Sequence, residues 1–279
     1  MIDGIKIFDA HMHIIGRFKK REQSLADYLD QYGIDKAVIT SLNTKASLNS
    51  IAALSNFNGE LNSSAKEQFD KFRMKEQYEH KEVLNIIREN PDRFVGFFWF
   101  NPKIAKRNDE HYTLLEKYLK EYDFKGVKTQ WNVDNLTIKD FEELAEFLIE
   151  KDVPLFFHTG YPFAFQRPIR AKDIRKFVKK YPALKVIVGH AAFTMEHCID
   201  VLMFLKDCSN VYFETSISVP YGIGTLIKAM GNHRVIFGSD SPSATTPDIE
   251  INKIRILNLD KETLEKVFYN NISEVIGVE

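Results

Sequence analysis

Short apolar runs alternate with amphipathic segments along nearly the whole chain, and this alternation limits the fold more than any other feature of the sequence. The apolar runs are typical of buried strands, and the segments between them repeat apolar residues at helical spacing. Strands are expected at 5–7, 37–39, 94–100, 126–131, 153–157, 186–189, 211–213 and 235–238. Helices are expected at 24–32, 83–87, 112–122, 141–149, 174–180, 196–205, 223–230 and 264–276. Eight strands, each followed by a helix, predict an α/β fold of the (β/α)8 TIM-barrel type, with residues 1–279 as a single domain.

Residues 43–74 interrupt this rhythm. Asn and Ser are frequent there, and Gly59 separates two short apolar stretches. We predict an insertion in the loop after the second strand, with a lid over the barrel as its candidate role.

The charge balance favours a small-molecule partner. The chain has 38 basic and 39 acidic residues, so its net charge of -1 provides no field that would attract nucleic acid or an anionic membrane. No apolar segment approaches the ~18 residues that cross a bilayer, and the N-terminus lacks the pattern of a signal peptide. Cys198 and Cys208 lack metal-binding spacing and are expected to be reduced thiols. These features predict a cytoplasmic protein.

Two histidines, His11 and His13, follow the first apolar run. Residues i and i+2 of a strand point to the same side, so both imidazoles share one face. Such a pair suits Zn, Mn, Fe or Ni. An isolated His-x-His pattern is short and arises by chance, so it needs support from other parts of the chain.

Other strands provide this support. His158, His190 and Asp240 each follow an apolar run, at the strand ends where barrels carry their ligands and catalytic groups. Nitrogen and oxygen donors without a thiolate suit a divalent metal that activates water. Asp240 is a candidate for both ligand and proton acceptor, and His190 for an acid, base or electrophile unless it is itself a ligand. The remaining histidines are expected at the surface: His80, His111, His197 and His233.

The motifs around these residues point to a known family. They are Phe8-Asp9-Ala10-His11-Met12-His13, Gly126-Val127-Lys128, Phe157-His158-Thr159-Gly160, Val188-Gly189-His190-Ala191, Phe237-Gly238-Ser239-Asp240-Ser241-Pro242 and Tyr269-Asn270-Asn271. With them the chain resembles the amidohydrolase superfamily, and more narrowly its amidohydrolase-2 branch of metal-dependent hydrolases and decarboxylases. The resemblance implies that His11, His13, His158 and Asp240 bind one divalent metal, usually zinc with manganese as the alternative, and that His190 is catalytic.

Lys128 has three interpretations. In binuclear members of the superfamily a lysine at this strand is carboxylated and bridges two metals, and His190 would then bind the second. The lysine could instead bind a substrate carboxylate, or simply be a buried lysine paired with a carboxylate. Trp131, Tyr161 and Arg167 are further candidates for substrate contact, because they lie in loops that follow strand ends. Glu214 and Asp9 are candidates for supporting a ligand histidine.

Three functions remain open from the sequence. The leading hypothesis is a metal-dependent hydrolase of the amidohydrolase type that uses activated water on a C–O or C–N bond of an ester, lactone or amide. The alternative is a lyase that decarboxylates an aromatic or unsaturated carboxylic acid at the same site without redox change. The third is a barrel that binds a ligand without catalysis. The partner is a small molecule, carboxylated in the second case, and a homodimer is the assembly that barrels of this type suggest.

Overall fold

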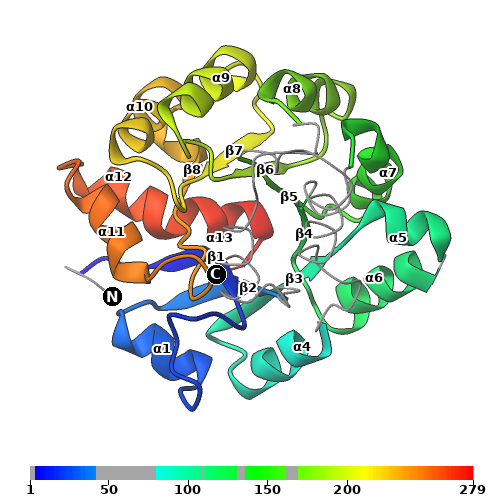
Figure 1. The fold of residues 1–279 in the computed structure, drawn as a ribbon, viewed down its shortest axis with the longest axis horizontal. Helices are drawn as coiled ribbons and strands as arrows, with labels where there is room; N and C mark the ends of the chain where they lie inside the picture. Colours follow the sequence, from blue (N-terminus) through cyan, green and yellow to red (C-terminus); the bar gives the residue numbers. More distant parts are fainter. Residues whose placement is uncertain (1–3, 42–79, 109, 131–135, 161–168, 279) are drawn as a thin grey trace, which may run out of the picture.

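The computed structural model describes residues 4–41, 80–108, 110–130, 136–160 and 169–278, and it confirms the predicted barrel. Eight parallel strands form one sheet in the order of the chain, and helices surround it (Figure 1). The strands are β1 Phe8–His13, β2 Lys36–Thr40, β3 Phe94–Trp99, β4 Gly126–Gln130, β5 Leu155–His158, β6 Val186–Gly189, β7 Val211–Glu214 and β8 Val235–Ile236.

The first strand joins the segment that follows β8. The Ala10 backbone N–H donates to the Phe237 carbonyl at 3.0 Å, and the His13 N–H donates to the Ser241 carbonyl at 2.8 Å. These bonds bring the first and last strands of the barrel together. They also place His13 beside the segment that carries Asp240.

The helices of the described residues follow the strands as expected, with two additions. They are α1 Leu25–Gln31, α4 His80–Glu89, α5 Pro102–Arg107, α6 Glu110–Glu121, α7 Glu142–Glu150, α8 Ala171–Lys180, α9 Met195–Leu205, α10 Pro220–Met230, α11 Pro247–Arg255, α12 Lys261–Glu265 and α13 Asn271–Ile276. Short 3-10 turns lie at Ile138–Phe141 and Asn232–Arg234, and a π-helical turn lies at Lys266–Asn270. Helices α5 and α11 were not expected from the sequence.

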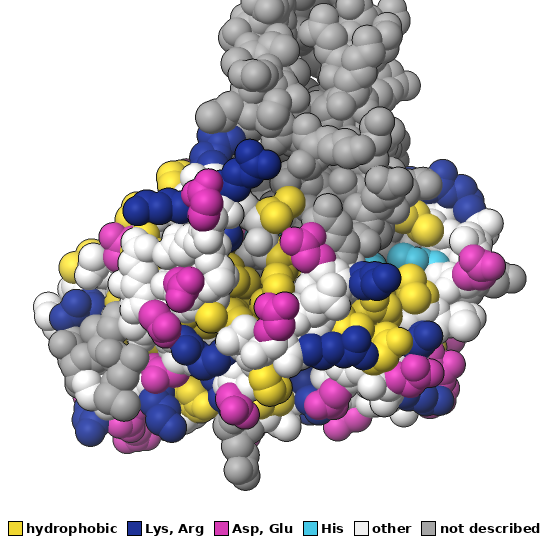
Figure 2. All heavy atoms as spheres, turned by 90° about the horizontal axis from the view of Figure 1, so that it is seen from below, with side chains coloured by type: hydrophobic (Ala, Val, Ile, Leu, Met, Phe, Trp, Pro, Cys, Tyr) yellow, Lys and Arg dark blue, Asp and Glu magenta, His cyan; other side chains and the backbone are white. Residues whose placement is uncertain are grey.

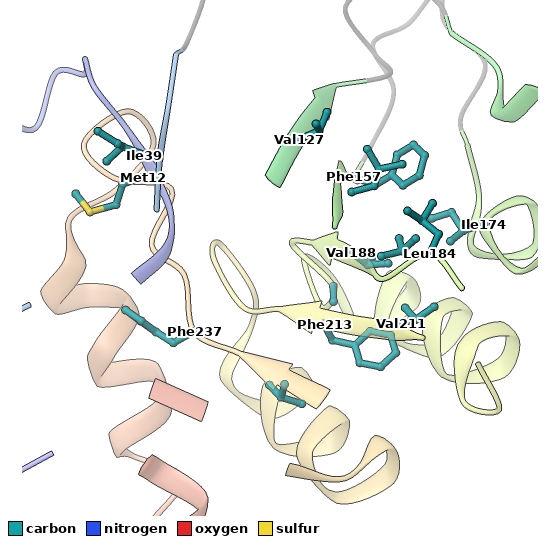
Figure 3. Packing of buried hydrophobic residues seen from close by; sticks show 14 of the residues in the cluster. Met12, Ile39, Val127, Phe157, Ile174, Leu184, Val188, Val211, Phe213 and Phe237 are labelled. Atoms are coloured by element: carbon teal, nitrogen blue, oxygen red, sulfur yellow. The ribbon is translucent and has the colours of Figure 1, made fainter. Parts of the chain in front are cut away.

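Two apolar layers hold the barrel. Strand residues that point inward, among them Phe8, Val38, Phe97 and Phe156, pack with side chains of α13 inside the ring. Residues of the opposite strand faces pack against the surrounding helices, and Figure 3 shows part of this layer with Phe157, Val188, Ile174 and Leu184. Because side chains alternate along a strand, the residue two positions after an inward apolar residue also points inward. Trp99 and His158 therefore follow Phe97 and Phe156 towards the C-terminal end of the barrel.

Two histidines that were expected at the surface are buried, so that prediction was wrong. The His80 ring stacks on Phe98 with centroids 3.8 Å apart, and the His111 ring stacks on Phe100 at 4.6 Å. Their polar neighbours in the sequence concealed this environment, which is formed by β3. His197 is half-buried, with its Nε2 atom 3.0 Å from the Thr159 hydroxyl, whereas His233 is exposed as expected.

The surface offers no dominant charge on the face shown in Figure 2, where basic and acidic side chains are interspersed with apolar ones. Within the described ranges, no helix has the length and apolar character needed to cross a membrane. The predicted insertion at 43–74 lies outside the described residues.

Candidate metal and catalytic site

Both histidines of the first motif point into the C-terminal end of the barrel. A register shift between Asp9 and Met12 interrupts the pairing of β1 with β2, and His11 and His13 are only 2% and 3% exposed. Their ring centroids are 5.2 Å apart. The predicted shared face is therefore present.

Asp240 completes a triad with these histidines. Its Oδ1 atom lies 3.0 Å from His13 Nε2 and 3.6 Å from His11 Nε2. The three residues offer donor atoms that all lie within 4.8 Å of one another. Imidazole nitrogens and a carboxylate oxygen form a set that divalent transition metals prefer, so these residues fit a metal ion.

A second group with the same spacing consists of His11, His190 and Glu214. The Glu214 carboxylate already has three hydrogen-bond donors: Oε1 accepts from the Ser216 backbone N–H at 2.6 Å, and Oε2 accepts from the His190 N–H and the Ser216 hydroxyl. These contacts use the carboxylate to join strand ends. Glu214 thus supports the site and is a poor candidate for a ligand.

His158 and His190 face each other beside the triad. The His190 Nε2 atom lies 3.1 Å from His158 Nδ1 and 3.9 Å from Asp240 Oδ2. His158 belongs to neither group of closely spaced donors among the described residues. Its role as a ligand therefore stays a prediction.

Lys128 lies inside the barrel, against His11. Its side chain is 1% exposed, its Nζ atom is 2.8 Å from His11 Nε2, and it lies 3.6 Å from the centroid of the Phe156 ring. Burial lowers the pKa of Lys128 to about 7, against the opposing influence of Asp240 and Glu214. No ion pair of Lys128 is found within the described part of the chain, so the interpretation as a buried lysine directly paired with a carboxylate gains no support there.

The protonation states suit metal binding. Burial is the main cause that lowers the pKa of His11 to about 3 and the pKa of His158 well below its ordinary value. Burial alone would raise the pKa of Asp240, but the nearby histidines outweigh it and hold that pKa well below its usual range. Neutral imidazoles and an ionised carboxylate are the forms that coordinate metals.

Asp9 joins the two ends of the sheet. Its Oδ1 atom accepts from the backbone N–H groups of His11 and Ser239, at 2.9 and 3.0 Å. Burial raises the pKa of Asp9 to about 8, so this carboxyl group is largely protonated at neutral pH. Asp9 thus fixes the backbone beside His11 and Asp240.

Three left-handed backbone conformations occur at the strand ends of the site. His190, Ile217 and Asp240 have φ values of 57°, 55° and 55°. Such conformations are uncommon outside glycine, and a β-branched residue adopts them rarely. At Ile217 the backbone N–H donates to the buried Glu250 carboxylate of α11 at 3.1 Å, which stabilises this turn.

Two further residues of the site, Ser216 and Trp99, were not predicted from the sequence. Ser216 contacts both His11 and His190, and Trp99 lies with its ring 6.2 Å from that of His13. The polar run that follows β7 would have indicated Ser216, because it continues directly from Glu214. The predicted substrate contacts Trp131, Tyr161 and Arg167 lie outside the described residues.

Comparison with known proteins identifies the family. The family model described as Amidohydrolase matches residues 8–278. The chain belongs to this amidohydrolase family, in its amidohydrolase-2 branch. No curated protein matches the chain. The family assignment supports an enzyme and leaves the reaction open.

Several solved enzyme structures share the fold of this chain. The 5-carboxyvanillate decarboxylase of Novosphingobium aromaticivorans, complexed with manganese and a nitrobenzoic acid, is 15% identical with a TM-score of 0.68, over 99% of this chain and 97% of that one. A dihydroxybenzoic acid decarboxylase from Polaromonas with manganese and 2-nitroresorcinol is 15% identical with a TM-score of 0.63, over 98% and 97%. The 4-oxalomesaconate hydratase of Rhodopseudomonas palustris is 14% identical with a TM-score of 0.62, over 97% and 95%. At these identities the likeness establishes the fold alone.

Proposed function

We propose that this amidohydrolase-family protein is a metal-dependent decarboxylase of a small aromatic or unsaturated carboxylic acid. The observation that carries the proposal is the triad of His11, His13 and Asp240 at the C-terminal end of a barrel whose similar structures include manganese-containing decarboxylases of hydroxylated benzoic acids. Hydrolysis, the leading hypothesis from the sequence, thus becomes the alternative. The solved hydratase on this fold belongs to another class of lyase, which also favours chemistry other than amide hydrolysis.

The triad would hold one divalent ion, and we assign His158 as a further ligand from the family motif. Manganese is preferred over zinc because the similar decarboxylases contain it. When bound, such an ion would neutralise and orient the carboxylate of the substrate. A second ion is not part of the proposal, because Glu214 already accepts three hydrogen bonds.

The chain itself would bind the acid and move a proton. We assign Lys128, in its ammonium form, to the electrostatic attraction of an anionic substrate, since its buried Nζ atom lies 2.8 Å from His11 of the triad. Loss of carbon dioxide breaks a C–C bond and leaves the electron pair on the ring carbon, where a proton must replace the carboxyl group. We assign His190 Nε2 to take up a proton from water and deliver it, and Asp240, whose Oδ2 lies 3.9 Å away, to stabilise the protonated imidazole.

The test is turnover of a defined panel. Chain treated with a chelator and then given Mn²⁺ would be incubated with hydroxylated benzoic acids, unsaturated dicarboxylic acids, aryl esters and lactones, and both carbon dioxide and free acid would be measured. The proposal predicts metal-dependent carbon dioxide release from an acid and none of the ester or lactone hydrolysis. Ester or lactone hydrolysis without decarboxylation would establish the hydrolase instead. Tight binding of an acid without any turnover would favour the non-catalytic barrel.

A further inference from the structure

Ser216 lies between two histidines of the site and is fully buried. Its hydroxyl oxygen is 3.1 Å from His11 Nδ1 and 2.9 Å from His190 Nδ1. The hydroxyl also donates to Glu214 Oε2 at 2.9 Å. One small side chain therefore contacts both rings and a carboxylate.

The direction of these hydrogen bonds follows from the available protons. A serine hydroxyl has a single hydrogen, and an ionised carboxylate only accepts, so the hydrogen of Ser216 points to Glu214. Both Glu214 oxygens accept a backbone N–H, Oε1 from Ser216 and Oε2 from His190, so both act as acceptors here. The Ser216 oxygen then accepts from both rings, and each Nδ1 atom carries a proton.

Two further contacts lead to the same assignment independently. The His190 Nδ1 atom is 3.1 Å from the Ser216 backbone carbonyl, which only accepts. On the other ring, His11 Nδ1 is also 3.4 Å from Glu214 Oε2, a carboxylate oxygen that only accepts, so the proton lies on Nδ1 and Nε2 presents its lone pair.

We propose that Glu214 and Ser216 are positioning residues that hold His11 and His190 in the Nδ1–H tautomer and leave both Nε2 lone pairs directed into the site. This inference rests on the proposed function for its catalytic meaning: His11 Nε2 is a donor to the metal, and His190 Nε2 is the atom that takes up a proton. It also implies that His158 donates its Nδ1–H to His190, since these nitrogens are 3.1 Å apart.

The substitution Glu214→Gln tests the direction of the chain of hydrogen bonds. An amide nitrogen at the Oε1 position would oppose the Ser216 N–H at 2.6 Å, whereas at the Oε2 position it opposes the His190 N–H at 3.1 Å. Placing the amide nitrogen at the Oε2 position is therefore less repulsive. In that orientation the amide N–H donates to the Ser216 hydroxyl oxygen. The Ser216 hydroxyl must then donate its hydrogen to one of the two rings. The Ser216 carbonyl holds the proton of His190 on Nδ1, whereas His11 has no such carbonyl acceptor among its described contacts, so His11 is the ring that accepts. E214Q is therefore expected to convert His11 to the Nε2–H form.

The matched control is Glu250→Gln. Glu250 is also buried and accepts from a backbone N–H of the same loop, that of Ile217, but no contact with either histidine is found among its described interactions. Both variants and the wild type would be examined as full chains after chelator treatment, with nitrogen-15 NMR of the histidine side chains and with Mn²⁺ titration. Folding of each variant would be checked by circular dichroism.

Wild-type protein is expected to show the Nδ1–H pattern for His11 and His190, and E250Q the same. E214Q is expected to show Nε2–H at His11 and a loss of Mn²⁺ affinity of about 10- to 100-fold. An Nε2–H pattern for either ring in the wild type would overturn the proposal, and this measurement needs no variant to fold. A folded E214Q with unchanged His11 and unchanged affinity would also overturn it. Wild-type Nδ1–H patterns in a protein that releases no carbon dioxide would refute the proposed function alone.

Discussion

The Nζ atom of Lys128 lies 2.8 Å from the Nε2 atom of His11, inside a barrel where both side chains are almost fully buried. The imidazole nitrogen that we assign to the metal thus faces the amine of Lys128, whose pKa burial lowers to about 7. Asp240 and Glu214 provide the negative charge that attracts a cation to this place. The two carboxylates therefore favour a metal ion here, whereas the ammonium form of Lys128 opposes it and favours an anionic substrate.

Replacing Lys128 is expected to separate activity from stability. K128M removes a buried cation that has no ion pair within the described residues, so we expect the free energy of unfolding to rise by about 1–3 kcal/mol while kcat/KM falls. Thermal unfolding and turnover would be measured on the same preparation. K228M, which changes an exposed lysine of α10, is the control. A less stable K128M with full activity would contradict the assignment.

Asp240 is expected to be required for turnover. D240N removes the charge beside His13 and His190, and we expect kcat/KM to fall by about 100- to 10,000-fold together with weaker metal binding. D248N changes an exposed carboxylate in the first turn of α11 and is expected to behave as the wild type. Equal activities of the two variants would refute the role of Asp240.

Gly238 is expected to tolerate no side chain. A Cβ atom there would lie 2.2 Å from Glu214 Oε1 and 2.9 Å from the Cβ of His11. G238A should therefore displace Glu214, weaken metal binding and cost about 1–3 kcal/mol of unfolding free energy. On α10, a Cβ at Gly224 meets Leu257 at an ordinary 3.4 Å, so G224A should stabilise the protein by up to about 1 kcal/mol. Metal affinity and the free energy of urea unfolding would be measured for both variants. Equal changes in G238A and G224A would contradict the close packing at Gly238.

Acid is expected to destabilise the fold through its buried histidines. Burial lowers the pKa of His80 to about 3 and the pKa of His111 to about 4, whereas the unfolded chain titrates near 6.5. The unfolded state therefore binds more protons below pH 6.5, and stability falls as the pH falls, by about 1.4 kcal/mol per pH unit for each such histidine. Substituting one of these histidines should reduce the change of unfolding free energy per pH unit by the contribution of that histidine.

The variant for this measurement is H80F, which keeps a ring beside Phe98. Urea unfolding between pH 4 and 7 should show a smaller slope in H80F than in the wild type, even if its overall stability is lower. H233F, at an exposed position of the turn Asn232–Arg234, is the surface control. An unchanged slope in H80F would show that His80 does not remain neutral in the fold.

The sequence predicted the barrel because most of its strands contain a short apolar run, which is typical of strands buried on both faces. It also predicted the polar residues at or after the ends of β5, β6 and β8, since these break an apolar run abruptly. The first strand was expected at 5–7, but β1 spans Phe8–His13 and holds both histidines within it. α5 and α11 were missed although Asn101-Pro102 and Thr246-Pro247 carry the signals of a helix N-terminus, because both helices are short and weakly periodic.

The remaining features depend on contacts between distant parts of the chain. His80 is buried because Phe98 and Tyr118 lie against it, and nothing in its own segment indicates this. Ser216 meets His11 across 205 positions of sequence. Neither pattern nor composition reports such contacts, so the arrangement around the triad required the structure.

The most direct test of the account is the metal content of the full-length protein, measured by inductively coupled plasma mass spectrometry before chelation and after reconstitution with Mn²⁺. The triad of His11, His13 and Asp240 predicts about one divalent ion per chain in the wild type and markedly less in D240N. Two ions per chain would restore the binuclear interpretation with a carboxylated Lys128. No retained ion in the wild type, with none bound on reconstitution, would contradict the metal site and the function proposed from it.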